Sequence, residues 1–328
     1  MKKFREPLIN TRSINQRSQQ FLIILYNIRN YCEIADVIVN TEQSAFGLFS
    51  VSLKPRGDVE MKNIGFIGMG NMALAIAEGF IKSGKVKGEN IFAYAPNQEK
   101  LKSNAAKIGF NAEDSVSKMI SKCDAVIVAC KPYQIKDVLG EKGGDVQTAL
   151  KGKALISVAA GWVHSTFHEI LGDDVRIQCI MPNTPALVGE GVMLFEKQNS
   201  LSEQELSQVK ELFSALGIIE ELPTNLMGIG GAISGCGPAF MDLIMEAYAD
   251  AAVKYGIARP TAYRLVAQTM LGSARLQQVT GNHPGVLKDA VCSPSGTTIR
   301  GVDSLEKNGL RGACISSIDV IMDFKSGK

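Results

Sequence analysis

The segment IGFIGMGNMA, Ile64–Ala73, constrains the fold of this chain more than any other part of the sequence. An apolar strand leads directly into Gly68-x-Gly70-x-x-Ala73, and a helical pattern follows it. The first glycine permits a tight turn, the second lets the backbone approach a pyrophosphate, and the alanine keeps helix and strand close together. The N–H groups at the start of the helix then face the phosphates. We therefore interpret the segment as the first βα unit of a dinucleotide-binding domain rather than as a structural glycine turn.

Apolar runs and helical patterns alternate along residues 61–224. The runs at 125–132, 154–161 and 175–182 are rich in Val, Ile and Ala, and such runs separated by helices are typical of parallel strands buried on both faces. A last strand is expected at 218–222, after an amphipathic helix. The sequence predicts an α/β protein whose N-terminal part is a Rossmann-like, doubly wound, mostly parallel sheet.

The strand signal stops after Pro223, and only helical patterns follow. The expected helices span 226–256, 260–280, 284–291, 297–307 and 310–324. We predict a Rossmann-like NAD(P)-binding domain at 61–224 and an all-helical substrate and dimerisation domain at 225–328. The helices are rich in Ala and Met and have long apolar faces, which indicates burial against a second chain.

Residues 1–60 differ from the rest of the chain, because they show neither a helical nor a strand period. Met61 opens what looks like the natural start of a domain. Three interpretations of the extension stay open: a translation-start artefact or cloning remnant, a targeting segment, or an accessory arm. The first is favoured, and the extension is not expected to be part of the fold. Its apolar run at 21–28 is too short to span a membrane.

Charge and cysteine content exclude several classes of protein. The chain has 35 basic and 33 acidic residues and a net charge of +2, so we expect neither a nucleic-acid surface nor a membrane partner. The seven cysteines form no C-x-x-C pair and no metal-ligand spacing. Reduced core thiols in a cytoplasmic protein are the simplest interpretation.

His164 and His168 are four residues apart, which in isolation is a spacing that suits a metal ion. No carboxylate or cysteine at a convincing distance completes a site. We expect no metal, and we assign the two histidines to a surface helix face.

Ligands of doubly wound sheets bind outside the carboxyl ends of the strands, so the residues following several strands are the candidate cofactor contacts. They are Phe66, Ile67, Gly68, Met69, Gly70, Asn71, Met72, Asn97, Ala129, Cys130, Lys131, Pro132, Ala159, Ala160 and Gly161. For Lys131–Pro132, a plain turn at the end of a strand is an almost equal alternative.

The end of the second strand selects between the two nicotinamide cofactors. NAD sites place Asp or Glu there for the ribose 2′-hydroxyl, and Tyr94–Asn97 contains neither. Asn97 can donate a hydrogen bond, and Lys100 and Lys102 can supply positive charge to a 2′-phosphate. A solvated helix face explains the two lysines equally well. NADP, used as NADPH, is therefore favoured, and use of NAD stays open.

Six segments in a fixed order make the chain from Met61 onward similar to the pyrroline-5-carboxylate reductase family. They are FIGMGNMA (66–73), ACKP (129–132), AAG (159–161), MPNTPALVGEG (181–191), ISGCGPAF (233–240) and HPGVLKDAVCSPSGTTI (283–299). The last two are quite specific to that family.

This resemblance implies hydride transfer from NAD(P)H to the C=N bond of 1-pyrroline-5-carboxylate, giving L-proline in the last step of proline biosynthesis. It also implies a homodimer with interlocked helical domains, which in such enzymes often assembles into larger rings. A protonated imine is already electrophilic, so the enzyme needs positioning, exclusion of water, a carboxylate clamp and a donor near nitrogen. That requirement fits a chain without a catalytic histidine constellation.

The resemblance also assigns the substrate site. It implies that Ser295, Gly296, Thr297 and Thr298 hold the substrate carboxylate, at the start of a helix whose N–H groups suit an anion. The Thr298 hydroxyl is the candidate catalytic group that hydrogen-bonds the ring nitrogen, and Ser234 and Gly235 line the other side. The chain departs from the family pattern at Cys236 and Ser295, where relatives often carry serine and glycine, and these changes put fine specificity in question.

The glycines of ISGCGPAF interrupt a helix at a cost of up to about 1 kcal/mol each, and a kink or a close approach explains them equally well. Two alternative functions remain. A β-hydroxyacid type dehydrogenase needs a Lys or His base near the nicotinamide, and Lys254 lies well past the glycine-rich segment. A non-catalytic NADP-binding protein needs no hydroxyl-rich segment such as CSPSGTT.

Overall fold

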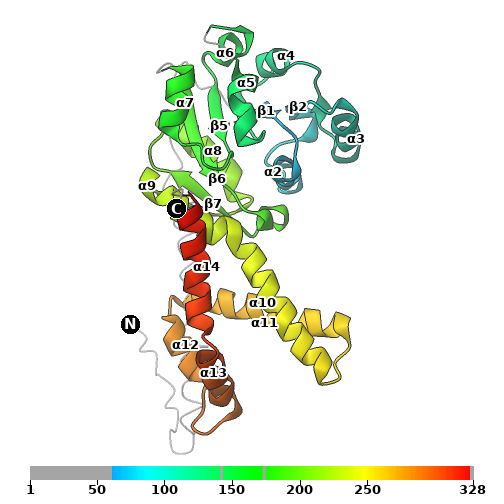
Figure 1. Cartoon of the computed structure of the whole chain (residues 1–328). Helices are drawn as coiled ribbons and strands as arrows, with labels where there is room; N and C mark the ends of the chain where they lie inside the picture. The colour runs from blue at the N-terminus through cyan, green and yellow to red at the C-terminus, as the bar shows by residue number, and fades with distance from the viewer. Residues whose placement is uncertain (1–60, 141–142, 173–174, 326–328) are drawn as a thin grey trace, which may run out of the picture. The chain divides into compact units, whose positions relative to one another are not determined.

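One eight-stranded sheet organises the chain up to Leu222 (Figure 1). The computed structural model describes residues 61–140, 143–172 and 175–325, and the expectations for residues 1–60 lie outside them. The strands are β1 (Ile64–Ile67), β2 (Ile91–Tyr94), β3 (Asn111–Ala112), β4 (Ala125–Val128), β5 (Ala154–Ser157), β6 (Arg176–Met181), β7 (Gly191–Glu196) and β8 (Gly217–Leu222). Their order is β3-β2-β1-β4-β5-β6-β7-β8.

The central strands are buried on both faces, as their continuous apolar runs predict. Every residue of β1, β4 and β5 is buried. Side chains alternate between the two faces, so Phe66 joins one hydrophobic core and Ile67 joins the other. The first core is covered by α2 (Asn71–Lys82), α3 (Gln98–Ile108) and α8 (Glu203–Ser214), and the second by α4 (Val116–Ser121), α5 (Ile135–Leu139), α6 (Asp145–Leu150) and α7 (His164–Leu171).

Strand β7 was not anticipated by the sequence pattern. The neighbours from β3 to β6 pair in parallel, whereas β7 is antiparallel to β6 and parallel to β8. Only a short 3₁₀ turn, η3 (Thr184–Val188), connects β6 to β7. A parallel neighbour requires a longer crossover connection, so this short link returns the chain in the opposite direction. The predicted edge strand at 218–222 is present as β8.

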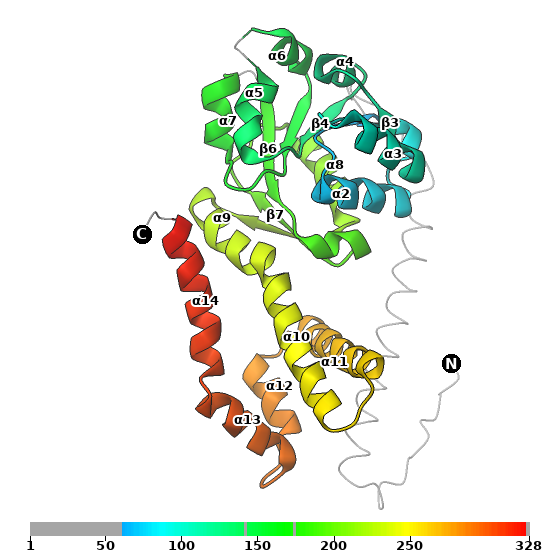
Figure 2. The same cartoon turned by 45° about the vertical axis from the view of Figure 1, so that its right-hand side comes forward.

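All elements described after β8 are helical. They are α9 (Thr224–Gly231), a π-helical turn (Ala232–Cys236), α10 (Gly237–Lys254), α11 (Arg259–Thr280), α12 (Pro284–Val291), α13 (Thr297–Lys307) and α14 (Leu310–Lys325). Helices α10 and α11 lie side by side, and α14 runs back to contact α9 (Figures 1 and 2). The predicted fold class is confirmed, while the exact domain limits at 61–224 and 225–328 stay a prediction.

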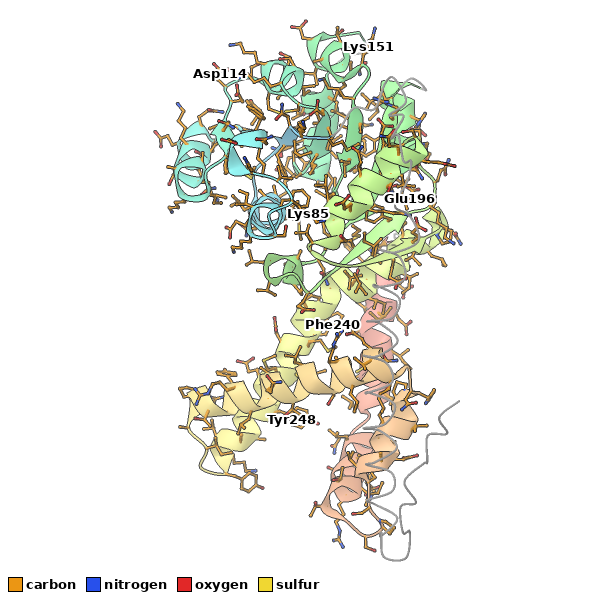
Figure 3. All side chains as sticks on the ribbon, turned by 180° about the vertical axis from the view of Figure 1, so that it is seen from behind. Lys85, Asp114, Lys151, Glu196, Phe240 and Tyr248 are labelled. Carbon is orange, nitrogen blue, oxygen red and sulfur yellow. The ribbon has the colours of Figure 1, made fainter. Side chains whose placement is uncertain are left out.

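The helices after Leu222 bury very little of their own apolar surface. Within the described ranges, the buried apolar side chains of this region are Met227, Ala232, Ala249 and Ala262. All but four of the large apolar side chains that are exposed lie here, the exceptions being Tyr133, Leu187, Val188 and Ile218. Figure 3 shows side chains projecting from these helices, with Phe240 and Tyr248 labelled among them. An apolar surface of this extent is typical of an interaction face.

The stretch Thr224–Lys254 is also long and apolar enough to cross a membrane, with a mean hydropathy of 1.2. Only 17% of its most apolar window is buried inside the chain, so the stretch is not a core helix buried within a single chain. Cover by a second protein chain is the alternative explanation of this exposed apolar stretch.

Candidate active site

A cavity of about 690 Å³ lies at the carboxyl ends of β1, β2, β4 and β5, and we call it the sheet-edge cavity. Its volume is in the range of small-molecule sites. The structure brings most of the predicted cofactor residues together there: Gly68, Met69, Gly70, Asn71, Met72, Asn97, Ala129, Cys130, Lys131, Pro132, Ala159 and Ala160.

The two motif glycines have different geometric reasons to be glycine. Gly68 has φ +94°, and a Cβ there would lie 2.7 Å from the backbone nitrogen of Cys130. Gly70 caps α2 without a side-chain hydrogen bond, and a Cβ there would meet no atom within 4 Å. The first-turn N–H groups of α2 therefore face open space, which suits the pyrophosphate of a dinucleotide.

The end of the cavity beside β2 contains positive charge and, among the residues described, no carboxylate. Asn97 caps α3, and its Oδ1 accepts a hydrogen bond of 2.9 Å from the backbone nitrogen of Lys100. Lys100 lines the cavity, whereas Lys102 does not. The structure thus separates two lysines that the sequence could not distinguish.

Three predicted cofactor residues lie elsewhere. Phe66 and Ile67 are buried inside β1, where they pack in the two cores and do not line the cavity. Gly161 lines the neighbouring cavity instead. Cys130 does line the sheet-edge cavity, and burial raises the pKa of its thiol to about 11, so it is uncharged at neutral pH.

A second cavity of about 640 Å³ adjoins the first, and we call it the inner cavity. The two cavities share Met72, Ala159, Ala160 and Thr184. The remaining walls of the inner cavity come from the loop after β5, the end of β6, α9, the π turn and the end of α14. These walls are Gly161, Trp162, Val163, Cys179, Ile180, Met181, Pro182, Asn183, Thr224, Met227, Gly228, Gly231, Gly235, Cys236 and Lys325.

The glycine-rich stretch 230–237 serves both as a helix irregularity and as a close contact. A π-helical turn occupies Ala232–Cys236, and π turns inside α-helices are frequent at functional sites. A Cβ on Gly231 would lie 2.5 Å from the sulfur of Met181, and one on Gly235 would lie 3.3 Å from its methyl group. The structure thus gives these glycines a reason of its own, which is a π-helical turn packed closely against the side chain of Met181.

Asn183 joins this turn to the sheet. Its Nδ2 donates to the carbonyl of Ser234 at 3.0 Å, and its Oδ1 accepts from the backbone nitrogen of Val192 at 2.8 Å. The Ser234 hydroxyl donates to the carbonyl of Gly230 at 3.0 Å, and Ser234 is buried and does not line the inner cavity. The prediction that Ser234 lines the substrate site is therefore not met within the chain, whereas Gly235 does line the cavity.

The hydroxyl-rich segment lies far from the inner cavity of its own chain. Ser295, Thr297 and Thr298 are exposed in and after the connection between α12 and α13, which both views place away from the sheet (Figures 1 and 2). Helix α14 separates the two regions, and its 16 residues span about 24 Å. A single chain thus does not assemble the predicted substrate site.

The segment itself has the geometry of an anion-binding turn. Ser295 adopts φ 59°, the left-handed conformation, and Gly296 caps α13 without a side-chain hydrogen bond. A Cβ on Gly296 would contact the Ser293 hydroxyl and lie 3.0 Å from the Ser293 carbonyl oxygen, so a side chain there would require Ser293 to move. The first-turn N–H groups of α13 remain available to a carboxylate.

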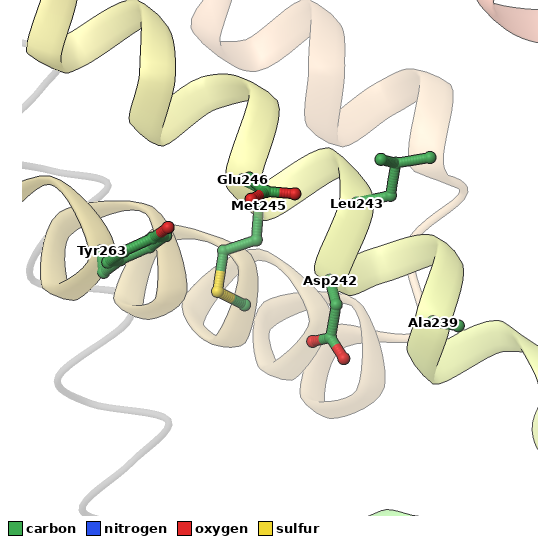
Figure 4. A pocket seen from close by; sticks show the side chains of 6 residues that line it. All are labelled: Ala239, Asp242, Leu243, Met245, Glu246 and Tyr263. Atoms are coloured by element: carbon green, nitrogen blue, oxygen red, sulfur yellow. The ribbon is translucent and has the colours of Figure 1, made fainter.

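A shallower hollow of about 530 Å³ lies on the exposed face of α10 and α11 (Figure 4). It is lined by Ala239, Asp242, Leu243, Met245, Glu246 and Tyr263. Leu243 is 65% exposed. A mixed apolar and acidic face of this kind is the surface that a second chain would cover, because nothing within the described residues covers it.

Of the two histidines of α7 that the sequence assigned to a surface face, His164 is buried and His168 is partly exposed. The ring of His164 lies 4.2 Å from the ring of His168. Burial, and secondly the charge of His168, lower the pKa of His164. No group of three or more His, Cys, Asp or Glu side chains suited to a metal ion occurs in the part of the chain that the structure describes.

Sequence reasoning missed several residues that line the inner cavity, among them Trp162, Asn183, Thr184, Thr224 and Lys325. A signal existed for two of these residues. Asn183 and Thr184 lie in the connection that follows β6. For other strands, the residues after the carboxyl end were the ones assigned to the cofactor. Thr224 and Lys325 carry no such signal, because they reach the cavity through the packing of distant helices.

The fold and the two adjoining cavities define an NAD(P)H-dependent oxidoreductase with a helical dimerisation domain. A pyrroline-5-carboxylate reductase of Treponema pallidum (strain Nichols) is 39% identical over 260 residues, which cover 78% of this chain and 97% of that protein. The chain belongs to the pyrroline-5-carboxylate reductase family. The Escherichia coli (strain K12) pyrroline-5-carboxylate reductase is 37% identical over 262 residues, or 80% of this chain and 96% of that protein.

Family models and solved structures agree with this assignment. The family described as pyrroline-5-carboxylate reductase dimerisation matches residues 224–326, and the family described as NADP oxidoreductase coenzyme F420-dependent matches residues 63–161. The crystal structure of Plasmodium falciparum pyrroline carboxylate reductase with NADP bound has a TM-score of 0.72 at 32% identity. It covers 80% of this chain and 97% of that one.

Proposed function

We propose that the protein transfers a hydride from NADPH to the C=N bond of 1-pyrroline-5-carboxylate and releases L-proline, in the last step of proline biosynthesis. The observation that carries this proposal is the pair of adjoining cavities in a chain of this family. One cavity suits a dinucleotide, and the other opens from it through Met72, Ala159, Ala160 and Thr184. The relative from Plasmodium falciparum has NADP bound, which supports the choice of cofactor.

NADPH supplies the hydride when it is bound in the sheet-edge cavity. The chain's own residues hold and orient the reactants: the start of α2 binds the pyrophosphate, and the apolar walls of the inner cavity exclude water. Among the described residues that line the two cavities there is no His, Asp or Glu. This composition suits an electrophilic iminium substrate, for which positioning supplies much of the rate enhancement.

The substrate site of this proposal is completed by a second copy of the chain. The segment Ser295–Thr298 lies too far from the inner cavity to act within one chain, and the exposed apolar helices around it require a partner. In an interlocked homodimer, the first turn of α13 from the partner subunit binds the substrate carboxylate, and the hydroxyl of Thr298 of the partner subunit hydrogen-bonds the ring nitrogen. Larger rings of such dimers belong to the same proposal.

The first test is a steady-state assay of the full-length protein. We expect loss of NADPH absorbance with 1-pyrroline-5-carboxylate and no reduction of NADP⁺ by β-hydroxyacids. The assay with hydroxyacids is needed because a hydroxyacid dehydrogenase requires a Lys or His base, and Lys325 lines the inner cavity. Its Nζ donates to the carbonyl of Gly228 at 2.8 Å. An enzyme that oxidises hydroxyacids and ignores the imine would overturn the proposal.

The choice between NADPH and NADH has a specific prediction at Lys100. Replacement of Lys100 by alanine should raise the KM for NADPH about tenfold, because one charge-assisted contact to the 2′-phosphate is lost. The KM for NADH should change little, since NADH lacks that phosphate. Lys102→Ala is the matched control, because Lys102 lies on the same helix outside the cavity. Equal effects of the two variants on NADPH would exclude the assignment.

We also place the enzyme in the cytoplasm. The six cysteines in the described ranges are free, and burial raises the pKa of the Cys123 thiol to about 12. Buried, protonated thiols suit a reducing compartment.

A further inference from the structure

Glu196 is a buried carboxylate behind the inner cavity, and the family motifs do not include it. It is the last residue of β7 and is only 1% exposed (labelled in Figure 3). Its Oε2 accepts a hydrogen bond of 2.8 Å from the backbone nitrogen of His164, at the start of α7. Its Oε1 accepts a hydrogen bond of 2.6 Å from the hydroxyl of Thr224, at the start of α9. Burial, and secondly the charge of Glu196, raise the pKa of the Cys179 thiol on β6.

Each of these donors belongs to a different wall of the inner cavity. Thr224 and Cys179 line the cavity themselves, and Trp162 and Val163 line it immediately before His164. Glu196 does not line the cavity. One carboxylate therefore joins the start of α7 to the first turn of α9 without lining the cavity itself.

Loss of these hydrogen bonds would be energetically costly, because they satisfy the oxygens of a buried carboxylate. A buried carboxylate is costly unless its oxygens accept hydrogen bonds, and no ion pair of Glu196 occurs among the residues described. The nearby His164 ring does not compensate, because neither of its ring nitrogens has a hydrogen-bond partner in the described structure. Burial lowers the pKa of His164, so its ring is neutral at physiological pH. The carboxylate thus depends on the backbone and hydroxyl donors, and they depend on it.

We propose that Glu196 is a positioning residue for the imine-reduction site, which holds Trp162 and Thr224 in place at the inner cavity. It acts through the Thr224 hydroxyl and the His164 backbone rather than by touching the substrate. The kinetic part of this inference rests on the proposed function, whereas its conformational part does not.

The kinetic test uses Glu196→Gln in the full-length protein. Glutamine has nearly the same shape but is uncharged and has only one acceptor oxygen. Its hydrogen bond from the His164 nitrogen is therefore weaker than that of a carboxylate, and Thr224, which then faces an amide nitrogen, can no longer donate to it. We expect kcat for the imine to fall about tenfold to a hundredfold, because small displacements in a positioned site are costly. The Kd for NADPH should stay unchanged, since the sheet-edge cavity does not depend on these bonds.

The conformational test does not require activity. Trp162 is the only tryptophan of the chain, so its fluorescence reports on the wall that Glu196 holds. Acrylamide should quench Trp162 about twice as efficiently in Glu196→Gln as in the wild type, at a temperature well below the unfolding transition. Glu205→Gln is the matched control: Glu205 also accepts hydrogen bonds in a partly buried position, but on α8, away from both cavities. It should leave the quenching unchanged.

A double-mutant cycle separates positioning from a general loss of stability. Thr224→Val removes the donor to Oε1, so it should lower kcat without changing Trp162 quenching. The effects of Glu196→Gln and Thr224→Val on kcat should be smaller together than their product, because both break the same bond. Multiplicative effects on kcat would overturn the proposal, as would a matching loss of NADPH affinity.

Two further outcomes are informative: a Glu196→Gln variant that does not fold, and a wild-type protein that does not reduce the imine. If Glu196→Gln does not fold, unchanged kcat and KM in Thr224→Val overturn the inference, and a reduced kcat supports it. If the wild type does not reduce the imine, the proposed function fails, and the quenching comparison still decides whether Glu196 holds the cavity wall.

Discussion

Replacing Leu276 and Val279 together by glutamate is expected to give a monomer that binds NADPH but reduces the imine at least about a hundredfold more slowly. Both side chains lie on α11, three residues apart on one face, and they are 52% and 69% exposed in the isolated chain. A dimer that covers this face would have to bury two unpaired carboxylates, each at a cost of several kcal/mol. The monomer would lack the partner's hydroxyl-rich turn, while its sheet-edge cavity would be complete.

Light scattering coupled to size exclusion gives the oligomeric state, and NADPH fluorescence titration gives cofactor affinity for the same sample. The control variant combines Lys151→Gln with Gln204→Glu, which changes the net charge by the same amount at exposed positions outside the helical region. It should remain oligomeric and fully active. A monomeric glutamate variant with wild-type turnover would show that one chain contains the whole substrate site.

The elements that sequence reasoning located well are those that local chemistry determines. Three of the gaps between the expected helices begin at, end at or directly follow a glycine, and these glycines have φ values that favour glycine: +96° at Gly256, +64° at Gly281 and +75° at Gly309. The residues of the sheet-edge cavity could also be predicted from the sequence, because they directly follow strands and the strand ends meet at one edge of a parallel sheet. Phe66 and Ile67 instead lie in the two cores, since a motif does not tell which of its side chains face the core, and Gly161 lines the inner cavity.

The parts that were missed depend on packing between segments far apart in the chain. Strand β7 pairs antiparallel because the link from β6 is short, and its apolar pattern alone does not reveal that. Thr224 reaches the inner cavity, and His164 becomes buried, only because α7 and α9 meet the end of β7. The distance between Ser295–Thr298 and the inner cavity could not be predicted either, because a sequence motif does not specify which copy of the chain in an oligomer completes a site.

The second large effect is expected at Thr298. Thr298→Ala should lower kcat for the imine about a hundredfold, because the hydrogen bond between the hydroxyl and the reacting ring nitrogen is removed. The Kd for NADPH should stay the same, since Thr298 does not line the sheet-edge cavity. Thr298→Ser keeps the hydroxyl and should recover most of the activity. A loss of NADPH affinity in Thr298→Ala would instead assign the residue to the cofactor.

The same variant tests whether the hydroxyl acts on the partner subunit's cavity. Gly70→Glu is its complement: Gly70 has φ −82° and free space around a Cβ, so the fold accepts a side chain whose negative charge repels the pyrophosphate. Gly70→Glu alone should be inactive, and Thr298→Ala alone should keep about one hundredth of wild-type activity. Mixed and refolded together, they should regain about a quarter of wild-type activity, because random pairing makes half the dimers hybrid and each hybrid has one complete site. No recovery in demonstrated hybrid dimers would mean that the cofactor cavity and Thr298 act within a single chain.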